Sequence, residues 1–532
     1  MTPGRRAAWA ALLLLAGLAG LGGAPLFDVD EGAFAEATRE LLASGDWSRT
    51  TLNGEPRWDK PILTYWLQAL AVMAFGLNEF ALRLPSLLAG WGWVLAVAAF
   101  ARARWGDDAA LGAGAVLAGG LGVAVIGRAA TADALLNLWL ALAGLDLWRH
   151  LEASTTAPGS AAARRPLRRA ALWIGLGGLT KGPIALLVPG AAVALAILAG
   201  PARRARLRAL LGDGPAWGVL LAVVLPWYGW TLWQHGPAFV DGFFIRHNLA
   251  RYGGALEGHG GSVAYYAVVL PLLMLPWTPL LGLVLARGRT LWREPLARYL
   301  LGWAGFVLVF FSLSGTKLPH YALYGVTPLA LLAGRTWADA GGLPGGRALR
   351  GLQRSLLVGL PLLAVAATLG VRQRAPHLDS PLYRALLSAP ADTTGLIATA
   401  LLAAGTTALA LARPGGRWRE PTGLAAAALV GLLWFHAALA PWWGERLQGP
   451  VRDLARLARQ QAPGTPAVQW GLHLPSFAVY LDREAPRRAP RPGELALVRA
   501  DQLDGLAAAA GGTWTGLGAA PGLRLIRWDG PR

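Results

Sequence analysis

Long apolar runs separated by short clusters of arginine recur along most of this 532-residue chain. A helix needs about 20 predominantly apolar residues to cross the hydrocarbon core of a bilayer. The first run lies in MTPGRRAAWAALLLLAGLAGLGGAPLF, and the others lie at 81–100, 109–127, 133–149, 171–182, 184–199, 216–234, 263–285, 299–314, 320–334, 355–371, 394–412 and 422–441. The pattern predicts an all-α polytopic membrane protein with about thirteen transmembrane helices.

The composition excludes several classes of protein. Hydrophobic residues make up 55% of the chain and charged residues 15%, whereas soluble domains are roughly 25% charged. A soluble multidomain enzyme and a disordered chain are therefore excluded. The absence of cysteine excludes disulfides, thiolate metal sites and a cysteine nucleophile.

The net charge of +19 comes mainly from arginine clusters that lie between the apolar runs. This is the pattern of cytoplasmic membrane loops, so we expect no nucleic-acid partner. When alternate loops are counted from a cytoplasmic N-terminus, the strongly basic clusters all fall inside, at 5–6, 102–104, 149–169, 203–208, 287–298, 335–354 and 413–419. This alternation requires a helix break at Gly182-Pro183. Its main exception is Arg372, Arg374 and Arg384, which fall outside.

The N-terminal run has two interpretations, a cleaved signal peptide and an uncleaved first helix. Because many apolar runs follow, we predict the uncleaved helix. Residues 25–80 and everything after about 442 then lie outside the membrane. We therefore predict a transmembrane domain over 1–441 and a small extracytoplasmic domain over 442–532.

The 25–80 segment is acidic, with nine acids and four bases. EGAFAEATRELLA (31–43) has the periodicity of an amphipathic helix. PILTYWLQALAVMAFG (61–76) begins with a proline that favours a helix start, and it is short for a membrane span. We predict that this second helix lies at the membrane interface.

The C-terminal segment changes in character after about residue 450. VRDLARLARQQ has a helical pattern, whereas AVQWGLHL, FAVYL, ELALVRA and LRLIRW are typical of strands between turns. We therefore predict a small α/β domain without an evident chemical motif.

Acidic residues at the outer boundary are the first candidates for chemistry, because charge is costly there. Asp28, Asp30 and Glu31 follow the first span, and Asp133 follows Arg128 between two others. Each group has a simple structural interpretation, since Asp30 and Asp133 are suited to cap helices. The alternative is that both carboxylates face one cavity, where they bind a cation or act as a base.

Basic residues on the same outer side oppose the positive-inside rule. Lys60 follows Asp59 at the start of the interfacial helix, where it either reaches lipid headgroups or binds one specific phosphate. The remaining cations and imidazoles of this set are Arg246, His247, Arg251, His259, Lys317 and His320. Arginine and lysine are natural phosphate ligands, whereas His247 is either a plain polar residue or part of a metal site with an acid.

Carboxylates and phosphate-binding cations on one membrane face suit group transfer from a lipid phosphate. A carboxylate deprotonates an acceptor hydroxyl, and the cations stabilise the departing phosphate. No P-loop or dinucleotide fingerprint is present, and no cofactor is required. Two other classes stay open, a lipid-sugar flippase and an integral structural or binding protein. The flippase interpretation lacks the internal repeats typical of transporters.

The outer segment DVDEGAFAEATRELLASGDWSRTTLNGEPRWDKPILTYWLQALAVMAFGLNEFALRLPSLLAG resembles one bacterial glycosyltransferase family. That family is related to the protein O-mannosyltransferases and the lipid A aminoarabinose transferase. TADALLN, GLTKGP, LPWY, FFIRHNLARY, the YY…LPW stretch and SLSGTKLPHYALYGVTPLALL resemble its later segments in the same order, over about 25–335. The resemblance implies a GT-C fold in a bacterial inner membrane, a polyprenyl-phosphate sugar donor and a lipid, glycan or protein acceptor.

The resemblance also assigns roles to individual residues. It implies Asp30 as the catalytic carboxylate and Asp133 as a second one, with Lys60, Arg251 and Lys317 as donor-phosphate contacts. Asp59 and His247 match positions that take part in a divalent-metal site in the aminoarabinose transferases. We expect Asp28, Glu31, Arg128, Arg246 and Tyr321 to support the site. The chain departs from that subgroup at Ala33, which replaces an arginine, and at Asp59, which replaces a glutamate.

Overall fold

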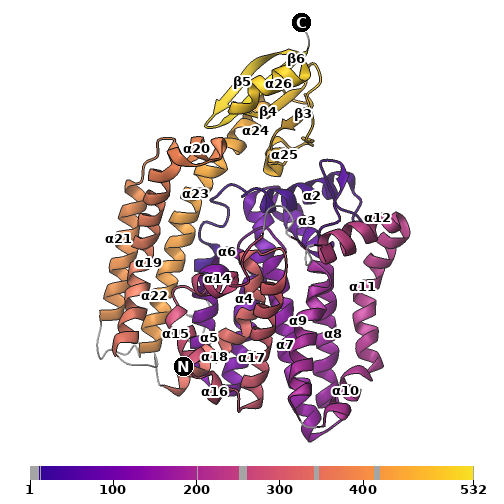
Figure 1. The fold of residues 1–532 in the computed structure, drawn as a ribbon, viewed down its shortest axis with the longest axis vertical. Coiled ribbons are helices and arrows are strands. Elements are labelled where there is room, and N and C mark those ends of the chain that lie inside the picture. Colours follow the sequence, from indigo (N-terminus) through magenta and orange to yellow (C-terminus); the bar gives the residue numbers. More distant parts are fainter. Residues whose placement is uncertain are drawn as a thin grey trace.

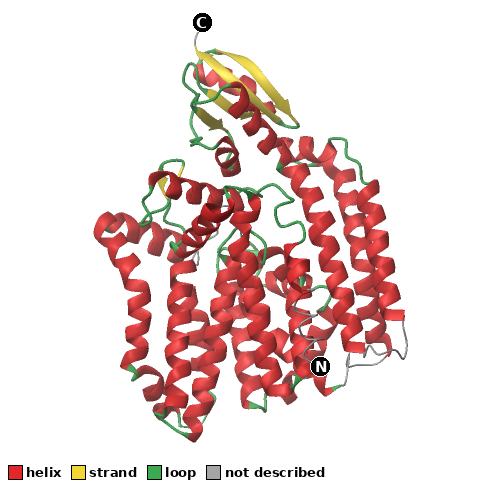
Figure 2. Cartoon of the chain, turned by 180° about the vertical axis from the view of Figure 1, so that it is seen from behind, coloured by secondary structure: helices red, strands yellow, loops and turns green. Residues whose placement is uncertain are grey.

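The computed structural model describes residues 11, 13–200, 202–250, 254, 260–340, 347–412 and 420–530. Most of them form long helices that run side by side (Figure 1), and a small sheet lies beyond one end of this bundle. The helices α2 and α3 lie across the same end of the bundle, below the sheet. The cartoon seen from behind shows the same two-part arrangement (Figure 2).

Six helical stretches among the described residues are long and apolar enough to cross a membrane. They are α4 (Glu79–Trp105), α11 (Gly214–His235), α17 (Pro295–Leu313), α21 (Thr394–Ala412) and the stretches Arg347–His377 and Gly423–Leu447. The first of these stretches contains α19 (Arg347–Arg374), and the second contains most of α22 (Glu420–Trp434) and α23 (Ala440–Leu447). The chain is therefore an integral membrane protein.

The other helices of the bundle are shorter or less apolar. They are α5 (Asp107–Gly119), α6 (Leu121–Ile126), α7 (Asp133–Thr156), α8 (Ala161–Lys181), α9 (Ile184–Leu198), α10 (Arg203–Leu211), α12 (Pro237–Phe239), a π-helix (Val240–Ala250), α14 (Tyr265–Leu273), α15 (Thr278–Ala286), α16 (Gly288–Leu291), a 3-10 turn (Pro319–Gly325), α18 (Val326–Asp339) and α20 (Pro381–Ser388). The break predicted at Gly182-Pro183 is confirmed, because α8 ends at Lys181 and α9 begins at Ile184.

Two runs predicted as single helices, 109–127 and 263–285, are each divided. The first is interrupted at Gly120, and the second between α14 and α15, where Pro276 has no N–H to continue the helical ladder. The two interruptions meet, since the Leu121 N–H donates to the Leu275 carbonyl at 2.9 Å. The freed backbone groups of one break are thus satisfied by the other.

The outer segment contains α2 (Asp30–Ser44), a hairpin of β1 (Thr51–Leu52) and β2 (Glu55–Pro56), and α3 (Leu63–Phe75). Both predicted helices are therefore present. They share an apolar cluster with α11 and α12 in which Phe34, Tyr65, Trp227 and Phe239 are buried. This packing fixes the start of α2 relative to the membrane helices.

The C-terminal segment forms a four-stranded sheet in the order β3-β4-β6-β5. Its elements are α24 (Gly449–Gln461), β3 (Ala467–Trp470), α25 (Pro475–Leu481), β4 (Leu495–Arg499), α26 (Leu503–Ala510), β5 (Thr513–Ala520) and β6 (Leu523–Gly530). β3 pairs parallel with β4, and the other two pairs are antiparallel.

The prediction of a strand at FAVYL was wrong, because these residues belong to α25. A short apolar run does not distinguish a strand from a buried helix. Pro475 occupies the first helical position, and Phe477 and Ala478 are buried in the core of the C-terminal sheet. The opposite side of α25 contacts α2, so tertiary packing decides the conformation here.

Candidate functional site

A buried ion pair joins the first residue of α7 to the last residue of α8. The Lys181 ammonium lies 2.6 Å from the Asp133 carboxylate, and the Tyr324 hydroxyl donates to the same oxygen at 3.1 Å. Asp133 is 7% exposed. Because α8 ends at the Gly182-Pro183 break, Lys181 is held at the end of that helix. Its ammonium there reaches the carboxylate of Asp133, the first residue of α7.

His320 connects this pair to the outer segment. Its Nε2 atom lies 3.7 Å from the Asp133 carboxylate and 3.5 Å from the Lys181 nitrogen. The charges of Asp30 and Lys60 also act on the His320 ring. Asp30, Lys60 and Asp133, which come from three separate segments, therefore all lie within electrostatic range of the His320 ring.

Aromatic rings form one wall of the cluster. The Lys181 nitrogen lies 5.6 Å from the ring centre of Tyr321 and 5.7 Å from that of Tyr324. His320 packs edge-on against Tyr321, with the two ring centres 4.8 Å apart. Such rings favour a cation electrostatically while excluding water.

Asp30 is exposed at the start of α2. The capping interpretation of this residue was wrong, because Val29 occupies the N-cap and no side chain caps the helix. The Asp30 carboxylate makes no hydrogen bond or ion pair with another described residue. Its charge acts on Arg57 and His320, so the exposed carboxylate lies within electrostatic range of both side chains.

A second buried ion pair, Glu31 with Arg83, holds the segments around the cluster. The Glu31 carboxylate accepts from the guanidinium at 2.9 and 2.7 Å and from the Ala130 N–H at 2.7 Å. Arg83 also donates to the Ala24 carbonyl at 2.6 Å. Burial alone would raise the pKa of Glu31, but the Arg83 charge and these hydrogen bonds lower it. The pair therefore ties the chain near Asp30 to the loop that precedes Asp133.

Asp28 connects the outer segment to the C-terminal sheet. Its carboxylate accepts hydrogen bonds from the Ser476 N–H at 2.9 Å and from the Ser476 hydroxyl. Burial raises the pKa of Asp28 to about 7, against the lowering effect of these hydrogen bonds. Nearby, the Leu26 N–H donates to the Tyr480 hydroxyl at 2.8 Å, so α25 contacts both Asp28 and the residues just before it.

The loop that carries Asp59 and Lys60 is organised by Arg57. The guanidinium donates to both Asp59 carboxylate oxygens, at 2.8 and 3.0 Å. The Lys60 nitrogen donates to the Asp59 carbonyl at 3.0 Å. Burial would raise the pKa of Asp59, but the charges of Arg57 and Lys60 hold it well below its usual range.

The expected metal site does not fit this arrangement. The charge of His247 acts on Asp59, so the two residues are neighbours. Both carboxylate oxygens of Asp59 are nevertheless bound by Arg57. Within the described part of the chain, no three histidine, aspartate or glutamate residues form a group that could hold a metal.

The remaining expected residues are more dispersed. Lys317 is buried, and its nitrogen donates to the Ser314 carbonyl at 2.6 Å. Arg128 lies within electrostatic range of Arg83, Glu31 and His436. Arg246 is exposed on the π-helix and has no ion pair among the described residues. Arg251 and His259 lie outside the described residues.

Sequence reasoning missed Lys181, Tyr324, Arg57 and Arg83 as members of the site. Lys181 had a detectable signal, because the predicted topology puts it on the outer side, at a break between two apolar helices, against the positive-inside rule. Arg57 and Arg83 had a similar signal, because both are basic residues near the predicted outer boundary, whereas Tyr324 carries none. The roles of Arg83 and Tyr324 depend on contacts between segments that are distant in sequence, whereas Arg57 binds Asp59 two residues away.

Comparison with known proteins places this geometry in a family. A family model described as dolichyl-phosphate-mannose-protein mannosyltransferase matches residues 59–230. An undecaprenyl phosphate-alpha-4-amino-4-deoxy-L-arabinose arabinosyl transferase of Serratia proteamaculans is 34% identical over 339 residues, covering 62% of this chain and 59% of that protein. A transferase of the same name from Pseudomonas aeruginosa (strain UCBPP-PA14) is 32% identical over 387 residues, covering 70% and 67%.

A third relative, arabinosyl transferase 2 of Pseudomonas fluorescens, is 32% identical over 403 residues, which is 74% of this chain and 70% of that protein. The crystal structure of ArnT from Cupriavidus metallidurans bound to undecaprenyl phosphate has the same fold, with a TM-score of 0.79 over all of both chains at 22% identity. The chain therefore belongs to the GT-C glycosyltransferase family that includes the mannosyltransferases and aminoarabinose transferases of these names.

Proposed function

We propose that this protein transfers a sugar from a polyprenyl phosphate to an acceptor hydroxyl or amine at the outer face of the membrane. The observation that carries the proposal is the position of Asp30. Its exposed carboxylate lies within electrostatic range of Arg57 and of His320, whose ring is next to the Asp133–Lys181 pair and also feels the Lys60 charge. This combination offers a base and a phosphate-binding set within one site.

The transfer conserves atoms and charge in a single displacement. The acceptor oxygen or nitrogen forms a bond to the anomeric carbon while the bond from that carbon to the phosphate oxygen breaks. Asp30 takes the acceptor proton, and the electron pair leaves with the lipid phosphate. Lys60, Arg251 and Lys317 are the proposed phosphate contacts, because ammonium and guanidinium groups stabilise the charge that grows on the leaving group.

Asp133 acts in this proposal through Lys181 rather than as a base. Its carboxylate is already bound to the ammonium and to the Tyr324 hydroxyl. It therefore positions a buried cation toward the phosphate, and Tyr321 excludes water from one side of it. No step is assigned to a metal, since the residues around Asp59 do not fit one.

The donor lipid is proposed to be undecaprenyl phosphate, by analogy with the named relatives, which act on undecaprenyl phosphate-linked aminoarabinose. The transfer assay below varies the donor sugar and the acceptor in order to identify both. Ala33 and Asp59 differ from the aminoarabinose subgroup, so a panel of sugars is needed.

The orientation is also part of the proposal. The arginine clusters favour a cytoplasmic N-terminus and about thirteen transmembrane helices over residues 1–441. Residues 442–532 then form an extracytoplasmic domain. This arrangement places Asp30, α25 and the donor sugar on the same side of the bacterial inner membrane.

A transfer assay tests the function. Purified full-length protein receives undecaprenyl phosphate carrying a panel of labelled sugars, with membrane extract as the acceptor source. Label that reaches an acceptor with the native protein but not with Asp30→Asn supports the proposal. Movement of labelled lipid-sugar across vesicles without any transfer product would favour a flippase instead.

A further inference from the structure

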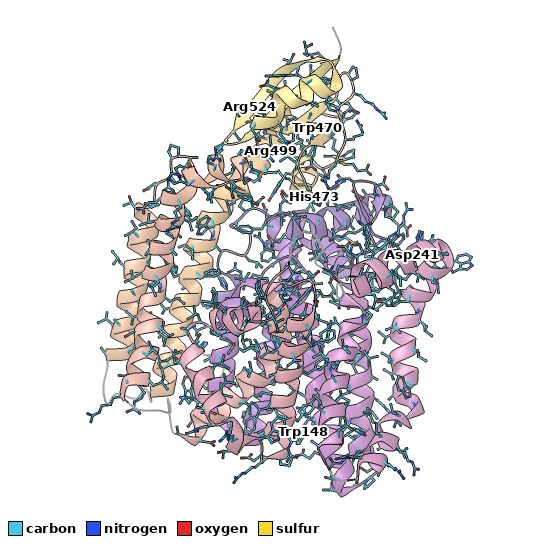
Figure 3. The ribbon with its side chains drawn as sticks, viewed as in Figure 1. Trp148, Asp241, Trp470, His473, Arg499 and Arg524 are labelled. Carbon is cyan, nitrogen blue, oxygen red and sulfur yellow. The ribbon has the colours of Figure 1, made fainter. Side chains whose placement is uncertain are left out.

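An apolar cavity of about 290 Å³ lies between α7, α8, α9, α10 and α11. Its walls include Leu147, Leu167, Ile174, Val193, Leu210 and Leu220. It lies near the end of the bundle opposite the sheet, the end at which Trp148 is found (Figure 3). The cavity is thus separate from the Asp133–Lys181 site.

Helix α10 covers one end of this cavity and is unusually basic. Leu207, Leu210 and Leu211 line the cavity. At 100° per residue, Arg204 and Arg208 fall together on one flank of that leucine face, and Arg206 falls on the other. The helix thus places an apolar face and flanking guanidinium groups along one cavity entrance.

The exposed arginines of α10 are not paired with acids in the part of the chain that the structure describes. Arg203, Arg204 and Arg208 are exposed, and none of them forms an ion pair with another described residue. The neighbouring arginines of α8 differ, because Arg168 binds Asp213 at 3.1 Å and Arg169 binds Asp146 at 2.7 Å. Acids at this end of the bundle therefore pair with α8, and none of the described acids pairs with the α10 arginines.

We propose that this cavity and α10 form a binding site for one anionic phospholipid. An acyl chain fills the apolar cavity, and the headgroup phosphate contacts the guanidinium groups of Arg204 and Arg208. Basic pockets between membrane helices are suited to anionic headgroups. Tight binding requires both the cavity and the arginines. Free phosphate has no acyl chain to fill the cavity, and a zwitterionic lipid brings no net negative charge to the arginines.

The first test compares lipids on the purified full-length protein in detergent. Phosphatidylglycerol is expected to raise the thermal unfolding midpoint and to bind in native mass spectrometry, whereas phosphatidylcholine with the same acyl chains and inorganic phosphate are not. Arg204→Gln/Arg208→Gln is expected to weaken the affinity for phosphatidylglycerol about thirty-fold. Arg287→Gln/Arg289→Gln removes two exposed arginines near α16 that do not line the cavity. This variant is expected to keep an affinity for phosphatidylglycerol within about twofold of the native protein's.

The second test fills the cavity without changing charge. An added side chain at Gly190 meets no atom within 4 Å at Cβ, and Gly190 lines the cavity. Gly190→Leu should therefore fold normally and lose the bound lipid. Gly282→Leu is the matched control, because that glycine also has open space but does not line the cavity. Equal binding of phosphatidylglycerol and phosphatidylcholine would overturn the proposal. So would an equal loss of phosphatidylglycerol binding in Arg287→Gln/Arg289→Gln or in Gly282→Leu.

Discussion

The Lys181 ammonium and the Asp133 carboxylate form a buried ion pair 2.6 Å across, although 48 residues separate them in the sequence. Taking two charges out of water is costly, so such pairs depend on further hydrogen bonds and good geometry. The Tyr324 hydroxyl supplies one such bond. The pair also holds a fixed cation beside His320, where the charges of Asp30 and Lys60 act.

This pair leads to a double-mutant prediction. Lys181→Met and Asp133→Asn are each expected to lower kcat/KM by about 10²- to 10³-fold. The double variant should be little worse than the poorer single variant, because the two residues act as one unit. Transfer kinetics with an undecaprenyl-phosphate sugar measure this. Additive losses would show that the two residues act separately.

Asp30→Asn is expected to abolish transfer while leaving the fold intact. General-base catalysis typically contributes about 10²- to 10⁴-fold, and the exposed Asp30 carboxylate makes no hydrogen bond with another described residue. Its loss should therefore barely change the thermal midpoint. Asp241→Asn is the matched control, since Asp241 is another exposed acid near the same end of the bundle (Figure 3).

The contact between Asp28 and Ser476 predicts a pH dependence of stability. The pKa of Asp28 is raised to about 7 in the folded protein, above its ordinary value of 3.8. The folded state therefore holds a proton that the unfolded state releases, and stability is lost as the pH rises from about 4 to about 7. The thermal midpoint of Asp28→Asn, relative to the native protein, should rise over this interval.

The comparison at each pH must use the native protein, because the pKa of Glu36 is also raised, to about 8, by burial. That group contributes with the same sign in both proteins and cancels in the difference. A midpoint difference that does not change between pH 4 and 8 would contradict the assignment to Asp28.

Gly32→Ala is expected to separate α25 from α2. A methyl group at Gly32 would lie 2.1 Å from the Asp28 carboxylate oxygen and 2.6 Å from the Ser476 nitrogen. Such overpacking costs about 1 to 3 kcal/mol. Limited proteolysis should then cleave the chain faster before the C-terminal sheet. Gly505→Ala in α26 is the control, since its added methyl group meets no atom within 4 Å.

Much of the architecture follows from the sequence, for a simple physical reason. Bilayer thickness dictates the length of apolar helices, and arginine placement indicates their register. The break at Gly182-Pro183 was predicted on this basis, as were α2, α3 and most elements of the C-terminal sheet. These features are local, so a single segment contains all the information needed to recognise them.

The tertiary structure decided what local patterns leave open. FAVYL became a helix because it packs between α2 and the C-terminal core. Lys181 and Tyr324 contact Asp133 across long sequence separations, whereas Arg57 binds both carboxylate oxygens of Asp59 two residues away. The sequence determined which charged groups stand at the membrane boundary. Only the fold determined which of them are neutralised by each other and which, like Asp30, stay accessible for chemistry, because pairing depends on distance in space.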